Sequence, residues 1–178
     1  AKRLEYLKEL VPALSRVGLL INPSAKISDL YIEQSNVAAS KLGLSSHVFP
    51  VRSVGELEGA FDAMAKSKMQ AVVVNAEGLF YQGKDIIAKA ALTRGLPTCV
   101  WVREVLEAGA LVSYGADQRA IARRVAVYVG RILKGEKPSD MPVEQPTKFE
   151  LVINSRTAKA LGIEVPPKLI ALADDVIE

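Results

Sequence analysis

The chain has 178 residues, of which 49% are hydrophobic and 24% charged, as expected of one globular domain and not of a disordered, fibrous or disulfide-rich protein. Its 23 basic and 20 acidic residues leave a net charge of +3, which is too dilute to indicate a nucleic-acid partner. A single Cys and a single His exclude a zinc site built from these residue types, and we predict no metal and no cofactor.

Short apolar runs alternate with amphipathic helical patterns, which predicts an α/β protein with a Rossmann-like parallel sheet flanked by helices. In chain order we predict helix 2–14, strand 17–21, helix 28–42, strand 47–51, helix 53–67, strand 69–74, helix 83–94, strand 98–102, strand 110–113, helix 117–133, strand 148–153, helix 155–161 and helix 166–177. Ser28, Ser53 and Ser155 begin three of these helices and are predicted to cap them. Residues 135–146 contain three prolines and predict an extended connection.

The beginning of the chain, AKRLEYLKEL, is typical of an amphipathic helix and not of a signal peptide. No apolar run approaches the roughly 20 residues of a membrane span. Because there is also no initiator Met, we expect the chain to be part of a longer protein.

Polar and aromatic side chains follow the predicted strands, and ligands of open parallel sheets bind beyond the carboxyl ends of their strands. The stretches at these ends are residues 22–28, 51–53, 75–79, 101–104 and 113–117. Residues 22–28 lead into a helix whose free N–H groups favour a carboxylate, and they lack the glycines of a phosphate-binding loop. Each polar residue alone also fits a turn or cap, and Trp101 fits the core as well as it fits stacking on a ligand.

Nucleophilic catalysis finds little support in the sequence, and we do not predict an enzyme. There is no G-x-S-x-G motif, and His47 has no evident acid to orient it. A catalytic pair of Cys99 and His47 would require the two to meet in space. A Rossmann-like enzyme would require Lys26, Glu77 and Tyr114 to converge.

Residues 111–178 contain the fragments SYG, ILKGEKP, QPTKFELVIN and KALG followed by VPP. Together with the earlier LKELVP, INP and REVLEAGAL, these fragments resemble the ABC-transporter substrate-binding family of tryptophan/tyrosine-type periplasmic binding proteins. The similarity extends over essentially the whole chain. The family is about twice as long, and this chain resembles its carboxyl-terminal half.

The resemblance implies the second lobe of a type I periplasmic-binding-protein fold, in which two Rossmann-like lobes are joined by a three-stranded hinge. Residues 1–112 would form the ligand-binding lobe. Residues 113–146 would be a crossover helix and connection that belong to the first lobe, and residues 147–178 would return as a strand and terminal helices. Hinge crossings are then expected near residues 113–117 and 145–148.

The resemblance also implies a function, that of the solute-binding component of an ABC uptake transporter, periplasmic or extracytoplasmic, which delivers its ligand to a permease in the membrane. The expected ligand is an amino acid, with aromatic amino acids or other aromatic carboxylates as the first expectation and branched amino acids or a purine-like ligand as the next. The ligand-binding residues that the resemblance implies are Asn22, Ser24, Ser28, Asn75, Glu77, Trp101 and Tyr114. The alternative is the effector-binding module of a transcriptional regulator, and the chain by itself is expected to self-associate.

Overall fold

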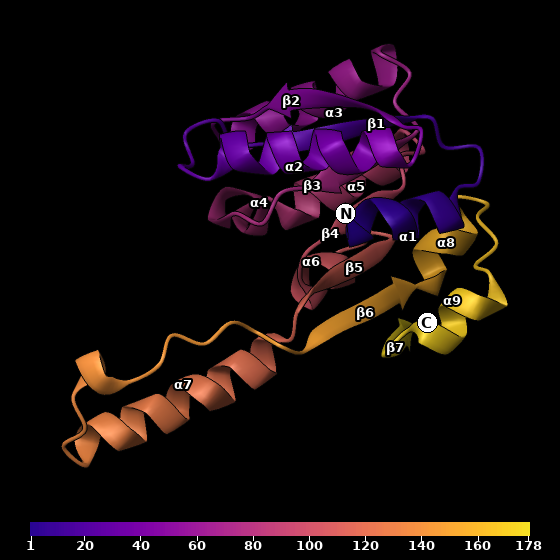
Figure 1. The fold of residues 1–178 in the computed structure, drawn as a ribbon. Coiled ribbons are helices and arrows are strands. Elements are labelled where there is room, and N and C mark those ends of the chain that lie inside the picture. Colours follow the sequence, from indigo (N-terminus) through magenta and orange to yellow (C-terminus); the bar gives the residue numbers. More distant parts are fainter.

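A seven-stranded sheet with the order β2-β1-β3-β4-β5-β6-β7 organises the chain (Figure 1). This computed structural model describes all residues from Ala1 to Glu178. The strands are β1 (Arg16–Ile21), β2 (Ser45–Pro50), β3 (Ala71–Val74), β4 (Thr98–Val100), β5 (Val112–Ala116), β6 (Phe149–Asn154) and β7 (Asp175–Ile177). Strands β1 to β5 are parallel, as the sequence predicts, so their carboxyl ends share one edge of the sheet.

Strand β6 departs from the predicted parallel sheet, because it runs antiparallel to β5. The chain leaves β5 at its carboxyl end and returns to the same end, so the strand that re-enters beside β5 must run in the opposite direction. Strand β7 is again parallel to β6.

Helices cover both faces of this sheet (Figure 1). They are α1 (Lys2–Leu10), α2 (Ser28–Lys41), α3 (Leu57–Lys66), α4 (Gly78–Gln82), α5 (Lys84–Thr93), α6 (Arg103–Glu107), α7 (Gln118–Leu133), α8 (Ser155–Ala160) and α9 (Pro167–Leu172), with short 3-10 turns η1 (Val54–Glu56) and η2 (Pro138–Asp140). Helices α1, α2, α8 and α9 contribute to one hydrophobic cluster, and α3 to α6 contribute to the other. Adjacent strand residues such as Val73 and Val74 enter opposite clusters, which explains the near-continuous apolar runs. None of the helices combines the length and the apolar character needed to cross a bilayer.

Several local predictions were wrong. The predicted helix 166–177 ends at Leu172, because Asp174 exchanges hydrogen bonds with Leu151 and leads the chain into β7. Ser28 does not cap α2, since its hydroxyl donates to the carbonyl of Asn22. Helix α8 is capped by Asn154, whose Oδ1 accepts the N–H of Thr157 at 3.0 Å.

Residues 117–148 form an arm that projects from the rest of the molecule (Figure 1). Its helix α7 has no buried residue, and the chain returns along α7 after the turn η2. Ion pairs join Arg124 to Glu144 and Arg131 to Glu136. Tyr128 donates a hydrogen bond of 2.6 Å to the carbonyl of Pro142, so the returning segment is held against the helix.

Candidate ligand-binding site

The carboxyl ends of β1 and β3 flank the point at which the strand order reverses, because β2 lies on one side of β1 and β3 on the other. Ligands of open α/β sheets bind in the crevice outside such a switch point. Asn22 directly follows β1 and Asn75 directly follows β3. The N–H of Asn75 donates to the carbonyl of Leu20 at 3.1 Å, so Asn75 lies beside the end of β1, at the switch point.

On the β1 side, hydrogen bonds hold the predicted residues Asn22, Ser24 and Ser28 together. Oδ1 of Asn22 accepts the N–H of Ser24 at 3.0 Å, and the hydroxyl of Ser28 donates to the Asn22 carbonyl at 2.5 Å. Asn22 and Ser28 are buried, whereas Ser24 is exposed. The N-cap residue of α2 is Ile27, which provides no side-chain cap, so the first turn of α2 keeps N–H groups and a dipole that favour an anion.

On the β3 side, Asn75 is buried with 3% of its surface exposed. Its Oδ1 accepts the N–H of Ala76 at 2.8 Å, which orients the carboxamide. Its Nδ2 is the one buried side-chain nitrogen or oxygen of the chain without a hydrogen-bond partner. A buried donor left unpaired costs about 1–3 kcal/mol, so its presence calls for an explanation. Glu77 instead caps α4, since its carboxylate accepts the N–H of Leu79 at 2.7 Å.

The two predicted aromatic residues face opposite sides of the sheet. Trp101 packs against the cluster of α3 to α6 and lines a small cavity of about 50 Å³. Tyr114 packs against the cluster of α1 and α2, with its ring 5.1 Å from Tyr6 and 5.6 Å from Phe149 between centroids. The structure therefore does not bring Trp101 and Tyr114 together around one cavity.

Arg3 is a residue of this edge that sequence reasoning missed. Its Nε donates to the carbonyl of Tyr114 at 3.0 Å, and its Nη1 lies 3.4 Å from the carbonyl of Val74 and 3.5 Å from the hydroxyl of Tyr31. Arg3 has no carboxylate partner. In the sequence it looks like any charge on the polar face of an amphipathic helix, so no signal distinguished it.

The two residue combinations considered for catalysis do not come together in the structure. Cys99 is buried in β4, and burial raises the pKa of its thiol to about 12. His47 lies in the edge strand β2 and bonds Ser45 at 2.9 Å, with two strands between it and Cys99. No hydrogen bond or ion pair joins Lys26, Glu77 and Tyr114, and no group of acidic, His or Cys residues is arranged to hold a metal.

The two segments expected as hinge crossings lie side by side at the base of the arm. Strands β5 and β6 pair there, and the N–H of Asp117 donates to the carbonyl of Lys148 at 3.0 Å. The Lys148 ammonium lies 2.8 Å from Oδ2 of Asp117, and Oδ1 of Asp117 accepts the N–H of Ala120 at 2.9 Å. The ammonium, followed by this N–H group, lowers the pKa of Asp117 to about 2.

This pair gives a pH prediction. Because the folded-state pKa of Asp117 is depressed, its contribution to stability is present above the ordinary value of 3.8 and is lost as the pH falls toward about 2. In Lys148→Met we expect the pKa of Asp117 to rise toward 3.8, measured by NMR titration of the carboxyl carbon. A value that stays near 2 would show that the N–H groups of α7, and not Lys148, hold the carboxylate.

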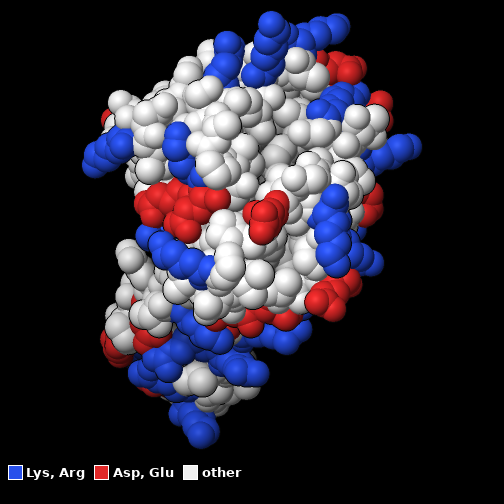
Figure 2. Space-filling view, turned by 90° about the vertical axis from the view of Figure 1, so that its right-hand side faces the viewer, with Lys and Arg blue, Asp and Glu red and all other residues white.

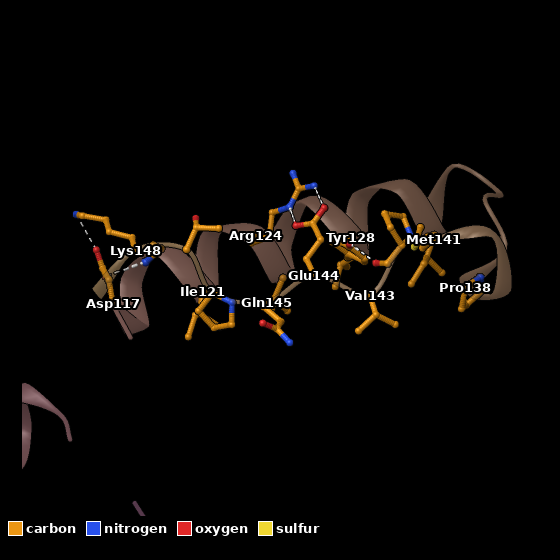
Figure 3. A pocket seen from close by; sticks show the side chains of 17 residues that line it. Asp117, Ile121, Arg124, Tyr128, Pro138, Met141, Val143, Glu144, Gln145 and Lys148 are labelled. Atoms are coloured by element: carbon orange, nitrogen blue, oxygen red, sulfur yellow. Dashed lines mark hydrogen bonds and ion pairs between the residues drawn. The ribbon is translucent and has the colours of Figure 1, made fainter. Parts of the chain in front are cut away.

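The arm also carries a groove of about 1030 Å³ between α7 and the returning segment (Figure 3). Its walls include Ile121, Val125, Val129 and Val143, and the last three are 55%, 49% and 100% exposed. Helix α7 has four arginines and no acidic residue, and in Figure 2 blue side chains gather at the lower end of the molecule, where the arm lies. No predicted ligand-binding residue lines the groove, so this apolar surface is separate from the candidate site.

A mostly parallel sheet covered by helices on both faces is the architecture of one lobe of a periplasmic binding protein, and the solved structures that this chain resembles are domains of that class. Residues 1–177 match the family described as ABC transporter substrate binding protein, and the chain belongs to this family. It is a family of solute-binding proteins rather than enzymes, and its members are typically extracytoplasmic. The comparisons do not favour the transcriptional-regulator alternative.

Individual relatives agree with this membership. The chain is 23% identical over 163 residues to a tyrosine-binding protein of Clostridioides difficile, covering 92% of this chain and 47% of that protein. It resembles the structure of an ABC domain from Streptococcus pneumonia in complex with L-Trp, with a TM-score of 0.91, 28% identity, and coverage of 99% of this chain and 59% of that chain. A conserved domain protein of Vibrio cholerae gives a TM-score of 0.90 and 25% identity, with coverage of 98% and 59%. The chain spans about half the length of the curated relatives it matches.

Proposed function

We propose that this chain is the second lobe of the solute-binding component of an ABC uptake transporter, located in the periplasm or otherwise outside the cytoplasm. It binds an amino acid, preferentially an aromatic one, and delivers it to a permease in the membrane. The observation that carries the proposal is the likeness to the L-Trp complex, which has a TM-score of 0.91 and 28% identity over 99% of this chain. The tyrosine-binding relative supports the same ligand class.

The proposed division of the chain follows from the exposure of the arm. Residues 1–112 and 147–178 carry most of the sheet and both clusters, whereas residues 113–146 contain the rest of β5 and most of the arm. The apolar face of α7 is exposed in this chain. A large exposed apolar face usually marks a surface that another protein or domain covers. We propose that the first lobe of the longer protein covers it.

In this reading the ligand lies between the carboxyl edge of the sheet and the first lobe. The switch point beside Asn22 and Asn75 and the start of α2 receive its carboxylate, and Tyr114, near the hinge, receives its side chain. Each lobe contributes part of the contacts, so the ligand stabilises the closed arrangement by its higher affinity for it.

Titration calorimetry on the full-length protein tests this function. We expect saturable binding of L-Trp or L-Tyr, and weaker or no binding of L-Leu and hypoxanthine, which represent the branched amino acids and the purines. The 178-residue chain alone is the matched comparison, and it is expected to bind at least about 100-fold more weakly because the contacts of one lobe are gone. Tight binding by the chain alone would contradict the two-lobed site, and no binding by the full-length protein would contradict the function.

A further inference from the structure

The net charge of the chain is concentrated on the arm, residues 117–148. This segment contains seven basic and four acidic residues, so its net charge of +3 equals that of the whole chain, and the rest of the chain is balanced. Three of the four acidic residues form ion pairs, with Arg124, Arg131 and Lys148, and the fourth, Asp140, lies in the turn η2. The arm therefore keeps basic side chains without acidic partners (Figure 2).

These unpaired basic residues share one face of α7. Arg119 and Arg123 lie within the helix and Lys134 is its C-cap residue, and all three are exposed. Their spacings of four and eleven residues place them within about 60° of one another around the helix axis. None of them lines the apolar groove of the arm, so they form a separate surface, which we call the basic strip.

The stability of α7 does not account for the basic strip. Arg119 lies in the first turn of the helix, where the helix dipole favours an acidic residue and disfavours a positive charge, and this turn has no acidic residue. Helix α7 also offers no Asp or Glu that could pair with Arg119 or Arg123 along the helix. Charges that the helix itself does not need favour a partner outside the chain.

The shape of the basic strip fits a broad surface better than a small anion. Its charges extend over about 22 Å along the helix, so they do not converge on one point. Ala126 and Gly130 lie between them on the same face, and no long side chain projects from the middle of the strip. Leu133, at the end of the strip, is 82% exposed. Basic residues on one helix face with an exposed aliphatic residue beside them are typical of contact with a membrane surface.

We propose that the basic strip binds the anionic surface of a lipid membrane, with Arg119, Arg123 and Lys134 at the lipid phosphates and Leu133 at the level of the headgroups. This inference rests on the proposed function in two ways. The first lobe covers the apolar groove, so the opposite face of α7 points outward, and delivery to a permease places the protein beside a membrane.

The test measures co-sedimentation of the full-length protein with vesicles of phosphatidylcholine that contain about 30% phosphatidylglycerol. We expect the wild type to bind these vesicles at about 0.05 M NaCl and to be released at about 0.5 M. Vesicles of phosphatidylcholine alone are expected to bind at least about 10-fold more weakly. In Arg119→Gln/Arg123→Gln/Lys134→Gln the affinity for the anionic vesicles is expected to fall at least about 10-fold.

Lys41→Gln/Lys66→Gln/Lys89→Gln is the matched control, because it removes the same charge from exposed lysines of α2, α3 and α5. Its affinity is expected to stay within about 2-fold of the wild type. An equal loss in both variants would overturn the inference, because the overall charge and not the basic strip would then attract the lipid.

A wild type that does not bind anionic vesicles would also overturn it. The same holds for a wild type that binds only to phosphatidylcholine vesicles containing the permease, since the basic strip would then contact a protein. Calorimetry with L-Trp separates this inference from the proposed function. Absent vesicle binding with intact L-Trp binding overturns the inference alone, whereas absent L-Trp binding overturns the proposed function.

Discussion

The 178-residue chain on its own is expected to self-associate through the apolar face of α7, and the double variant Val125→Asp/Val129→Asp is expected to be monomeric. These two side chains are 55% and 49% exposed and line the groove of the arm. Without a covering lobe, a second copy is the apolar surface available to them. Light scattering coupled to size exclusion over a range of protein concentrations measures the effect.

Val37→Asp provides the control for this experiment, because Val37 is 53% exposed on α2, away from the arm. It is expected to leave the association unchanged. A wild-type chain that stays monomeric at high concentration would contradict the prediction. In the full-length protein the double variant is expected to lower stability, because an uncompensated carboxylate buried under the first lobe costs several kcal/mol. The urea midpoint should fall accordingly.

The central part of the fold could be predicted from the sequence because its signals are local. Val72, Val73 and Val74 form an apolar run between turn residues, and such runs identify strands that are buried on both faces. The last part could not be predicted in this way. Asp175–Ile177 is three residues long and becomes β7 because Asp174 bonds Leu151, which is distant in the sequence.

The candidate site shows the same division. Asn22 and Asn75 could be placed at the carboxyl edge of the sheet from the sequence. The rule that ligands of open parallel sheets bind beyond the carboxyl ends of the strands needs only the order of strands and turns. The orientation of Trp101 could not be predicted. If β4 continued, the alternation of its side chains would turn Trp101 to the same side of the sheet as Cys99. The strand ends at Val100, and Trp101 packs on the opposite side. Arg3 was missed because its role depends on the carbonyls of Val74 and Tyr114, which only the folded chain brings to α1.

Among the glycines of this chain, Gly115 is expected to give the largest loss of stability when it is replaced by alanine. A Cβ atom at Gly115 would lie 1.9 Å from the carbonyl oxygen of Trp101 and 2.9 Å from its carbonyl carbon. Both atoms belong to the backbone, so β5 must move away from the end of β4 to make room. Overpacking of this kind typically costs about 1–3 kcal/mol, and urea denaturation measures the loss.

Gly130→Ala is the control, since Gly130 lies within α7 and a Cβ atom there meets nothing within 4 Å. In the 178-residue chain it is expected to raise stability by about 0.5–1 kcal/mol, because Ala favours the helix over the unfolded state. Stability equal to wild type in Gly115→Ala would show that β5 can shift without penalty.

Gly115 precedes Asp117 by two residues, and Asp117 ties the two crossing segments together through Lys148. A shift of β5 away from Trp101 therefore changes the direction in which the arm leaves the sheet. If the first lobe meets the carboxyl edge as proposed, this direction sets how the two lobes meet, and Gly115→Ala is then expected to weaken ligand binding in the full-length protein. Calorimetry at a temperature where the variant is fully folded separates this effect from the loss of stability. Unchanged affinity there would mean that the contact between Gly115 and Trp101 supports the fold but does not set the closure of the two lobes.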